Sequence, residues 1–154
     1  MLQFLTGGEM ANLNLLAIMF CAGVTIALQP SINARLAQKV GVLESACISF
    51  AVGTLALLLI VLLTGRGTVR GLGNAAWWEW TGGILGAIFV STTIFVVPRI
   101  GTTAAMAATI AAQLITGLIL DHYGAFGLRE IHFDLKRALG CALLAYGVIL
   151  IGKR

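Results

Sequence analysis

Residues 45–65, SACISFAVGTLALLLIVLLTG, contain no charged side chain and decide the fold of this chain. A helix of about 20 predominantly apolar residues crosses the core of a bilayer, so this stretch alone predicts a transmembrane span. The full 154 residues are 59% hydrophobic and only 10% charged, whereas soluble domains carry roughly 25% charged residues. The mean hydropathy is +0.99. This composition excludes most water-soluble enzymes and nucleic-acid-binding domains, which need polar side chains to coat their surface.

Weakly charged stretches elsewhere in the chain predict four further spans. We expect an all-α membrane protein with a single integral membrane domain over residues 1–154, whose five transmembrane helices cover about residues 12–36, 44–64, 77–97, 101–121 and 134–152. Helices are favoured over barrel strands, because backbone groups in hydrocarbon must be satisfied within their own segment and these stretches are too long for strands. The segment before the first span lacks a positively charged region, so we expect no cleaved signal peptide.

The ten Lys and Arg residues are divided equally between the two predicted membrane faces. One face holds Arg66, Arg70, Arg129, Lys136 and Arg137, and the other holds Arg35, Lys39, Arg99, Lys153 and Arg154. Orientation follows the imbalance of such residues, so an even division predicts insertion in both orientations, or dual topology. A five-helix unit paired with its inverted copy gives a ten-helix inverted-repeat architecture typical of transporters. We therefore expect an antiparallel homodimer, whose two-fold interface closes on itself.

A polar stripe is predicted on the first helix, where Thr25, Gln29 and Asn33 are spaced four residues apart. Pro30 interrupts this stripe and predicts a kink, because proline lacks a backbone N–H donor. Polar groups that face lipid are costly, so the stripe is predicted to line a polar cavity or to form interhelical hydrogen bonds. Ser49 on the second helix, within a stripe of small residues, has the same two interpretations.

A second stripe is predicted on the fourth helix, where Thr109 and Gln113 lie four residues apart. Gln113 falls near the middle of its span and keeps the polarity of its amide wherever it points. We interpret both residues as candidates for substrate binding, together with the polar residues of the first and second helices.

Small residues predict the packing surfaces. Gly82 and Gly86 form a GxxxG pair in the third helix, and Ala104 and Ala108 belong to an alanine-rich face of the fourth. Both patterns let helices approach closely. The third helix is expected to end at Pro98 and the residue after it.

No Asp, Glu, Lys or Arg lies in the middle of a predicted span. Coupling to protons would therefore require Glu44, Glu79, Asp121 or His122 to reach the cavity from near a membrane surface. The alternatives are a charge that favours a helix N-terminus for Glu44 and a solvated interfacial pair for Asp121 and His122. Without such coupling, the protein would be a passive facilitator or use another ion.

Two further residue types have structural interpretations. The tryptophans of residues 77–80, WWEW, suit the boundary between water and lipid, or alternatively a substrate-facing wall. No cofactor or metal site is expected, because the cysteines have no metal-binding or disulfide spacing and are predicted to be small buried thiols: Cys21, Cys47 and Cys141.

Blocks along most of the chain resemble the five-helix, half-size YdcZ-type branch of the drug/metabolite transporter superfamily. They are ALQPSINARLA at 27–37, ISFAVGTLALLL at 48–59, WWEWTGGILGAIFV at 77–90, VPRIG at 97–101 and QLITGLILDHYGAFG at 113–127. The resemblance implies a multi-pass protein of the bacterial inner membrane that pairs in antiparallel fashion and exports drugs or metabolites. Gln29 and Asn33 fall within the first of these blocks.

The expected function is that of a dual-topology small-molecule transporter, with alternating access through a polar cavity between two inverted protomers. Its partners are the lipid bilayer, a small solute and a second copy of the chain, without nucleic acid. The alternatives are a non-transporting membrane subunit that stabilises or regulates a partner, or one half of a heterodimeric transporter. We expect no enzyme, because GxSxG and HExxH motifs and paired intramembrane acids are absent from the sequence.

The charge balance predicts that a reporter fused after residue 154 will be active on both sides of the membrane. The physical reason is that neither face attracts the chain more strongly during insertion. The measurement compares two reporters, one active only in the cytoplasm and one active only outside it. Activity of one reporter alone would reject dual topology.

Overall fold

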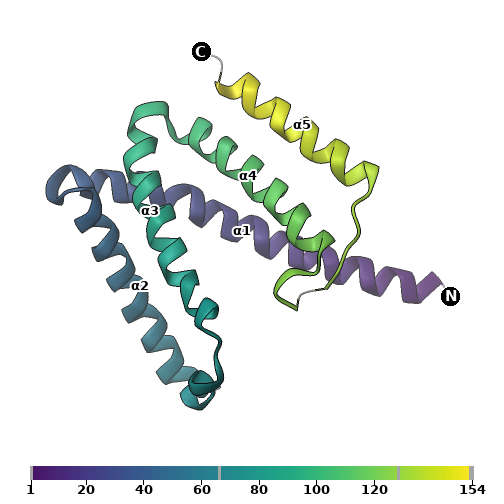
Figure 1. The fold of residues 1–154 in the computed structure, drawn as a ribbon, viewed down its shortest axis with the longest axis horizontal. Coiled ribbons are helices and arrows are strands. Elements are labelled where there is room, and N and C mark those ends of the chain that lie inside the picture. The colour runs from purple at the N-terminus through teal and green to yellow at the C-terminus, as the bar shows by residue number, and fades with distance from the viewer. Residues whose placement is uncertain (1, 66, 128, 153–154) are drawn as a thin grey trace. The chain divides into compact units, whose positions relative to one another are not determined.

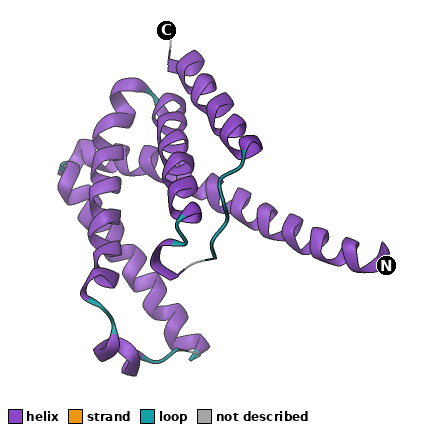
Figure 2. Cartoon of the chain, turned by 45° about the vertical axis from the view of Figure 1, so that its right-hand side comes forward, coloured by secondary structure: helices purple, strands orange, loops and turns teal. Residues whose placement is uncertain are grey.

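The computed structural model describes residues 2–65, 67–127 and 129–152, and within these residues the regular structure is entirely helical (Figure 2). Five long helices appear there: α1 Leu2–Val40, α2 Val42–Thr64, α3 Thr81–Ile100, α4 Thr102–His122 and α5 Leu135–Gly152 (Figure 1). Each is long and apolar enough to cross a membrane, which confirms the five predicted helices. Arg66, Lys153 and Arg154, which entered the count of basic residues, lie outside the described residues.

The two prolines lie inside helices. α1 continues through Pro30 to Val40. α3 continues through Pro98 and ends at Ile100, one residue beyond the predicted end at Pro98 and Arg99. Near the end of a helix a proline removes only one hydrogen-bond donor, and the remaining backbone bonds hold the last turn together.

Two pairs of consecutive helices are joined by a single glycine. Gly41 lies between α1 and α2 with φ 104° and ψ 162°, and Gly101 lies between α3 and α4 with φ 85° and ψ 156°. A residue with a side chain is strained at these φ and ψ values, so only glycine adopts them readily. A Cβ added at Gly41 would also meet the carboxylate of Glu44, so the Glu44 side chain would have to move.

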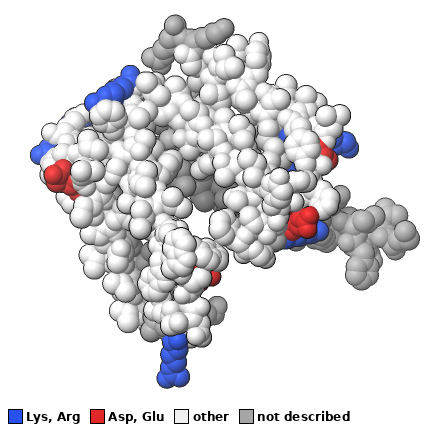
Figure 3. All heavy atoms as spheres, in the orientation of Figure 1, with Lys and Arg blue, Asp and Glu red and all other residues white. Residues whose placement is uncertain are grey.

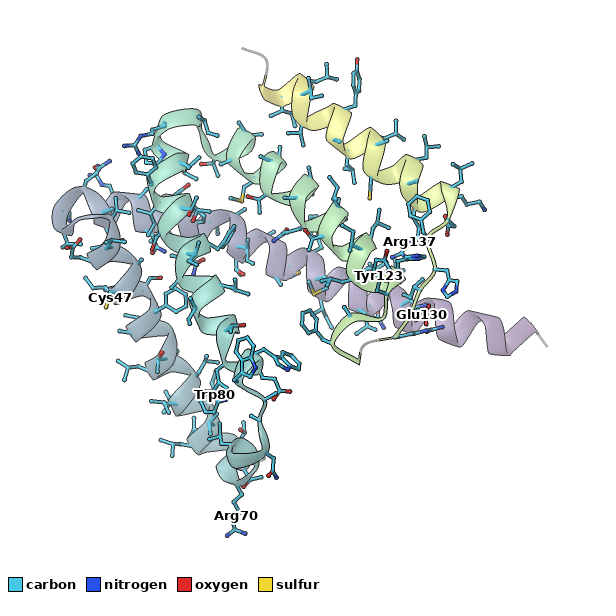
Figure 4. All side chains as sticks on the ribbon, in the orientation of Figure 1. Cys47, Arg70, Trp80, Tyr123, Glu130 and Arg137 are labelled. Atoms are coloured by element: carbon cyan, nitrogen blue, oxygen red, sulfur yellow. The ribbon has the colours of Figure 1, made fainter. Side chains whose placement is uncertain are left out.

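The longer connections contain short 3₁₀ helices: η1 Val69–Asn74, η2 Trp77–Trp80 and η3 Ala125–Gly127. The tryptophans of η2 are exposed and directly precede α3, and their place at the water–lipid boundary stays a prediction. In Figure 4, Arg70 of η1 projects away from the neighbouring helices.

The chain divides into two compact units, Met1–Pro98 and Arg99–Arg154. The first unit contains a small core built from Ala46, Val90 and Ile94, of which Ile94 is only 1% exposed. Partly buried apolar side chains surround this core: Ala37, Val42 and Phe89. In the second unit α4 and α5 pack side by side (Figure 1).

Most apolar side chains of the described residues face outward. In each candidate span, at most 22% of the residues in its apolar 18-residue stretch are buried. Figure 3 shows charged side chains at only a few places on the face that it presents. Such a surface suits lipid rather than water. Cys21 and Cys47 are exposed in this way (Cys47 labelled in Figure 4), and Cys141 is half-buried, so the prediction of buried thiols is wrong.

The predicted packing residues differ in their surroundings. A Cβ added to Gly86 would lie 3.2 Å from Cζ of Phe50, which means that the Phe50 side chain of α2 reaches the backbone of α3 there. A Cβ added to Gly82 would have no atom of the described residues within 4 Å. Ala104 is half-buried and Ala108 is exposed. Within one chain, only Gly86 of the GxxxG pair therefore allows a close contact.

Replacing Gly41 by alanine is expected to lower the free energy of unfolding by about 1–3 kcal/mol, because the new side chain is strained at this φ and meets the Glu44 carboxylate. Gly53→Ala is the matched control, since Gly53 lies inside α2 with no atom of the described residues near its Cβ position. Unfolding of both variants is measured in mixed detergent micelles. Equal stability of the two variants would contradict the proposed need for glycine at position 41.

Candidate functional site

α1 and α2 form a hairpin whose register is set by Gly41. Asn33 and Ser49 each lie eight residues from this glycine, and Gln29 and Gly53 each lie twelve residues from it. The predicted polar stripe of α1 therefore lies opposite the small-residue stripe of α2. Because Gly53 has no side chain, a groove of about 220 Å³ remains beside Gln29. We call it the α1–α2 groove, and its lining residues are Gln29, Ser49, Phe50, Gly53, Thr54 and Leu57.

Asn33 connects the two helices of this hairpin. Asn33 is only 6% exposed, and its Nδ2 donates a hydrogen bond to Oγ of Ser49 over 3.2 Å. In return, Oγ of the buried Ser45 donates to the backbone carbonyl of Asn33 over 2.8 Å. These contacts favour the interhelical interpretation of Asn33. Ser49 takes part in both the contact and the groove lining.

The other two members of the α1 stripe are exposed. Thr25 donates its hydroxyl to the carbonyl of Ala22 over 2.7 Å, one turn earlier on its own helix. Gln29 presents its amide to the α1–α2 groove. The stripe therefore contains one residue bonded to its own helix, one that lines a groove and one that links two helices.

A second groove lies between α4 and α5 in the other unit. Its volume is about 320 Å³, and we call it the α4–α5 groove; its lining residues are Gln113, Leu114, Gly117, Leu118, Asp121, Arg137, Gly140, Cys141 and Leu144. Gly117 and Gly140 lie on opposite helices and leave space between them. Gln113 is exposed on this groove, whereas the Thr109 hydroxyl donates to the carbonyl of Ala105 over 2.9 Å on its own helix.

An ion pair lies at one end of the α4–α5 groove. Nη2 of Arg137 donates to Oδ2 of Asp121, and the two side chains are 31% and 35% exposed. The connecting segment is tied to the same pair, since Nη1 of Arg137 donates to the carbonyl of Ile131 over 3.4 Å and the Ile131 N–H donates to the carbonyl of Asp121 over 2.8 Å. Figure 4 shows Arg137 near the end of α4.

Sequence reasoning named Asp121 but missed Arg137. The available signal was its position, because Arg137 lies in the first turn of the helix that follows Asp121. Oppositely charged residues at the two ends of one connection lie close together when the two helices pack in antiparallel fashion. From the sequence alone, Arg137 is interpreted only as a basic residue at the flank of a span.

His122 is occupied by the same connecting segment. Its Nδ1 accepts a hydrogen bond from the Phe133 N–H over 3.3 Å, so the ring proton of the neutral form belongs on Nε2. The ring also makes an edge contact with Tyr123, with centroids 4.9 Å apart. A role of His122 in proton handling stays a prediction.

The two candidate glutamates lie at the N-termini of helices. Glu79 accepts a hydrogen bond from the Ala76 N–H over 2.7 Å just before α3, and Glu44 lies in the first turn of α2. A carboxylate at such a position is favoured by the helix dipole. Both residues therefore have a structural role, and their part in proton coupling stays a prediction.

Five apolar helices, the scarcity of charge and grooves that contain amide groups define a multi-pass helical membrane protein. The family model described as "Putative inner membrane exporter, YdcZ" matches residues 14–150. The Inner membrane protein YdcZ of Escherichia coli (strain K12) is 28% identical over 145 residues, which cover 90% of this chain and 95% of that protein. No solved structure matches this chain.

The chain therefore belongs to the YdcZ family of the drug/metabolite transporter type. It is a multi-pass protein of the bacterial inner membrane. Membership of an exporter family supports membrane transport, rather than catalysis, as its activity.

The two amide side chains of α1 are expected to respond differently to truncation. Asn33→Ala should lower the free energy of unfolding by about 0.6–2 kcal/mol, because it removes an interhelical hydrogen bond. Gln29→Ala is the matched control and should leave stability nearly unchanged, since Gln29 is exposed on a groove. Unfolding in mixed micelles measures both, and a larger loss for Gln29→Ala would contradict this division of roles.

Proposed function

We propose that this protein is a dual-topology transporter of small molecules, in which two inverted protomers form an antiparallel homodimer. The solute crosses by alternating access through a polar cavity between the protomers. The residues proposed to bind it are Thr25, Gln29, Ser49, Thr109 and Gln113. Asn33 is proposed to act with them by positioning Ser49 through their hydrogen bond.

The observation that carries this proposal is the exposure of two amide side chains within candidate spans. Gln29 lies in the span Asn12–Val40 and Gln113 in the span Thr102–His122, and each is exposed on a groove between two helices. An amide in contact with hydrocarbon costs several kcal/mol on water-to-alkane scales. A wet cavity within an assembly removes this cost and also provides a path for a polar solute.

The inverted arrangement is supported by the equal division of Lys and Arg between the two membrane faces and by the odd number of helices. It is further supported by the exposed small residues of α4, such as Ala108, which can pack closely against a second chain. A partner that only stabilises another membrane protein would use these polar groups for contacts and would not need a wet path.

The test is transport by the purified chain in liposomes, with a panel of solutes and an imposed pH gradient. Gln29→Ala and Gln113→Ala are each expected to reduce the transport rate at least about tenfold, the effect of losing about 1.4 kcal/mol of binding. The matched control is Cys47→Ser, since Cys47 is exposed on α2 and lines neither groove. Gly53→Ala, the control for stability, is not used here because Gly53 lines the α1–α2 groove. Full transport by both glutamine variants would reject the proposed site.

The same assay tests the inverted dimer. Three lysines added after Arg154 should force one orientation, because they create an imbalance between the faces. Transport by the lysine variant alone should fall, and three added glutamines serve as the control. Full activity of the lysine variant would argue against an obligatory inverted pair.

A further inference from the structure

The α4–α5 groove contains both signs of charge at one end and is apolar along most of its length. Asp121 and Arg137 form the charged end, and Leu114, Leu118 and Leu144 provide apolar walls. Gln113 lies two turns of α4 away from Asp121, about 12 Å along the helix axis at 1.5 Å per residue. A ligand that fills this groove therefore meets an ion pair, an apolar passage and then an amide.

Arg137 has hydrogen-bonding capacity beyond its contact with Asp121. A guanidinium group carries five N–H donors, and the side-chain contacts described for Arg137 use Nη2 for Asp121 and Nη1 for the Ile131 carbonyl. The remaining N–H groups can donate to the two oxygens of a carboxylate in the bidentate geometry that arginine favours. The site can therefore receive an anionic group while the Ile131 contact still holds the arginine in place.

The pair of Asp121 and Arg137 has no net charge, and this determines which ligands can separate the two side chains. A cationic ligand that binds Asp121 would displace Arg137 and leave the guanidinium without its counter-ion, and an anionic ligand that displaces Asp121 would leave the carboxylate alone. Both side chains are only about one-third exposed, so an unpaired charge is costly there. A ligand with one charge of each sign avoids this cost, because each half of the pair gains a new partner.

We propose that the α4–α5 groove binds a small zwitterion with an apolar body, and that Asp121 and Arg137 exchange their mutual bond for bonds to its ammonium and carboxylate groups. This inference rests on the proposed transport function and names the class of solute. It also assigns Arg137 as a binding residue in addition to Gln113.

Cys141 offers a measure of binding that does not depend on transport, because it lines the same groove and is half-buried. In the full-length chain with Cys21→Ser and Cys47→Ser, the rate of Cys141 alkylation by N-ethylmaleimide is measured in liposomes. The probes share one apolar body and differ in charge: leucine is a zwitterion, leucine amide is a cation and 4-methylpentanoate is an anion.

Leucine at ten times its dissociation constant should slow alkylation about tenfold, since only the unoccupied fraction reacts. The cation and the anion at the same concentration should slow it by less than half as much. Asp121→Asn and Arg137→Gln should each abolish protection by leucine. Lys136→Gln is the matched control and should keep it, because Lys136 is exposed next to Arg137 and does not line the groove.

Either single variant could fail to fold, so the paired variant Asp121→Asn/Arg137→Gln is included, in which the two amides can still bond to each other. It should fold and show no protection by leucine. Protection by leucine in this variant, equal protection by the three probes, or no alkylation of Cys141 in the absence of a probe would overturn the inference. Protection without transport in liposomes would instead count against the proposed function alone.

Discussion

The structure depends on one constraint, that a polar group surrounded by hydrocarbon must find its partner within the protein. The backbone satisfies it through long helices, which continue past Pro30 and Pro98 because each proline removes only one donor. Threonine hydroxyls satisfy it locally, as Thr93 does by donating to the Val90 carbonyl over 2.9 Å on its own helix. Amide side chains cannot be satisfied in this way so easily, and they are therefore the groups that shape the grooves.

The α1–α2 groove and the α4–α5 groove are built in the same way, although they belong to different units. In each, an amide from one helix lies beside glycines that remove side-chain volume, Gly53 in the first unit and Gly117 and Gly140 in the second. Polar contact and open space are thus produced by neighbouring residues in one hairpin. Asn33 shows the contrasting outcome, because Ser45 and Ser49 are close enough to bond with it and no space remains.

The sequence predicted the five helices well, because the length of an uncharged stretch is a direct consequence of bilayer thickness. It also placed Gln29 and Asn33 on one stripe, since helical spacing defines a stripe, but it did not predict that Ser49 of the next helix bonds with Asn33. It did not distinguish the packed Asn33 from the exposed Gln29, because that difference depends on the register across Gly41. The Asp121–Arg137 pair was missed for a similar reason, as it depends on how two helices align rather than on either one. The prediction of buried cysteines failed because a short membrane chain leaves most of its apolar side chains for lipid to cover.

The one-residue connections at Gly41 and Gly101 give the chain two unlike ends. If each of the five candidate spans crosses the bilayer once, their directions alternate. Both one-residue connections then fall on one side, and both long connections, which contain η1 to η3, fall on the other. In the proposed antiparallel homodimer, each aqueous compartment would meet the short connections of one chain and the long connections of the other. Such a pair would have the same groups on both faces, and any net direction of flux would have to come from the ion and solute gradients that the cell maintains.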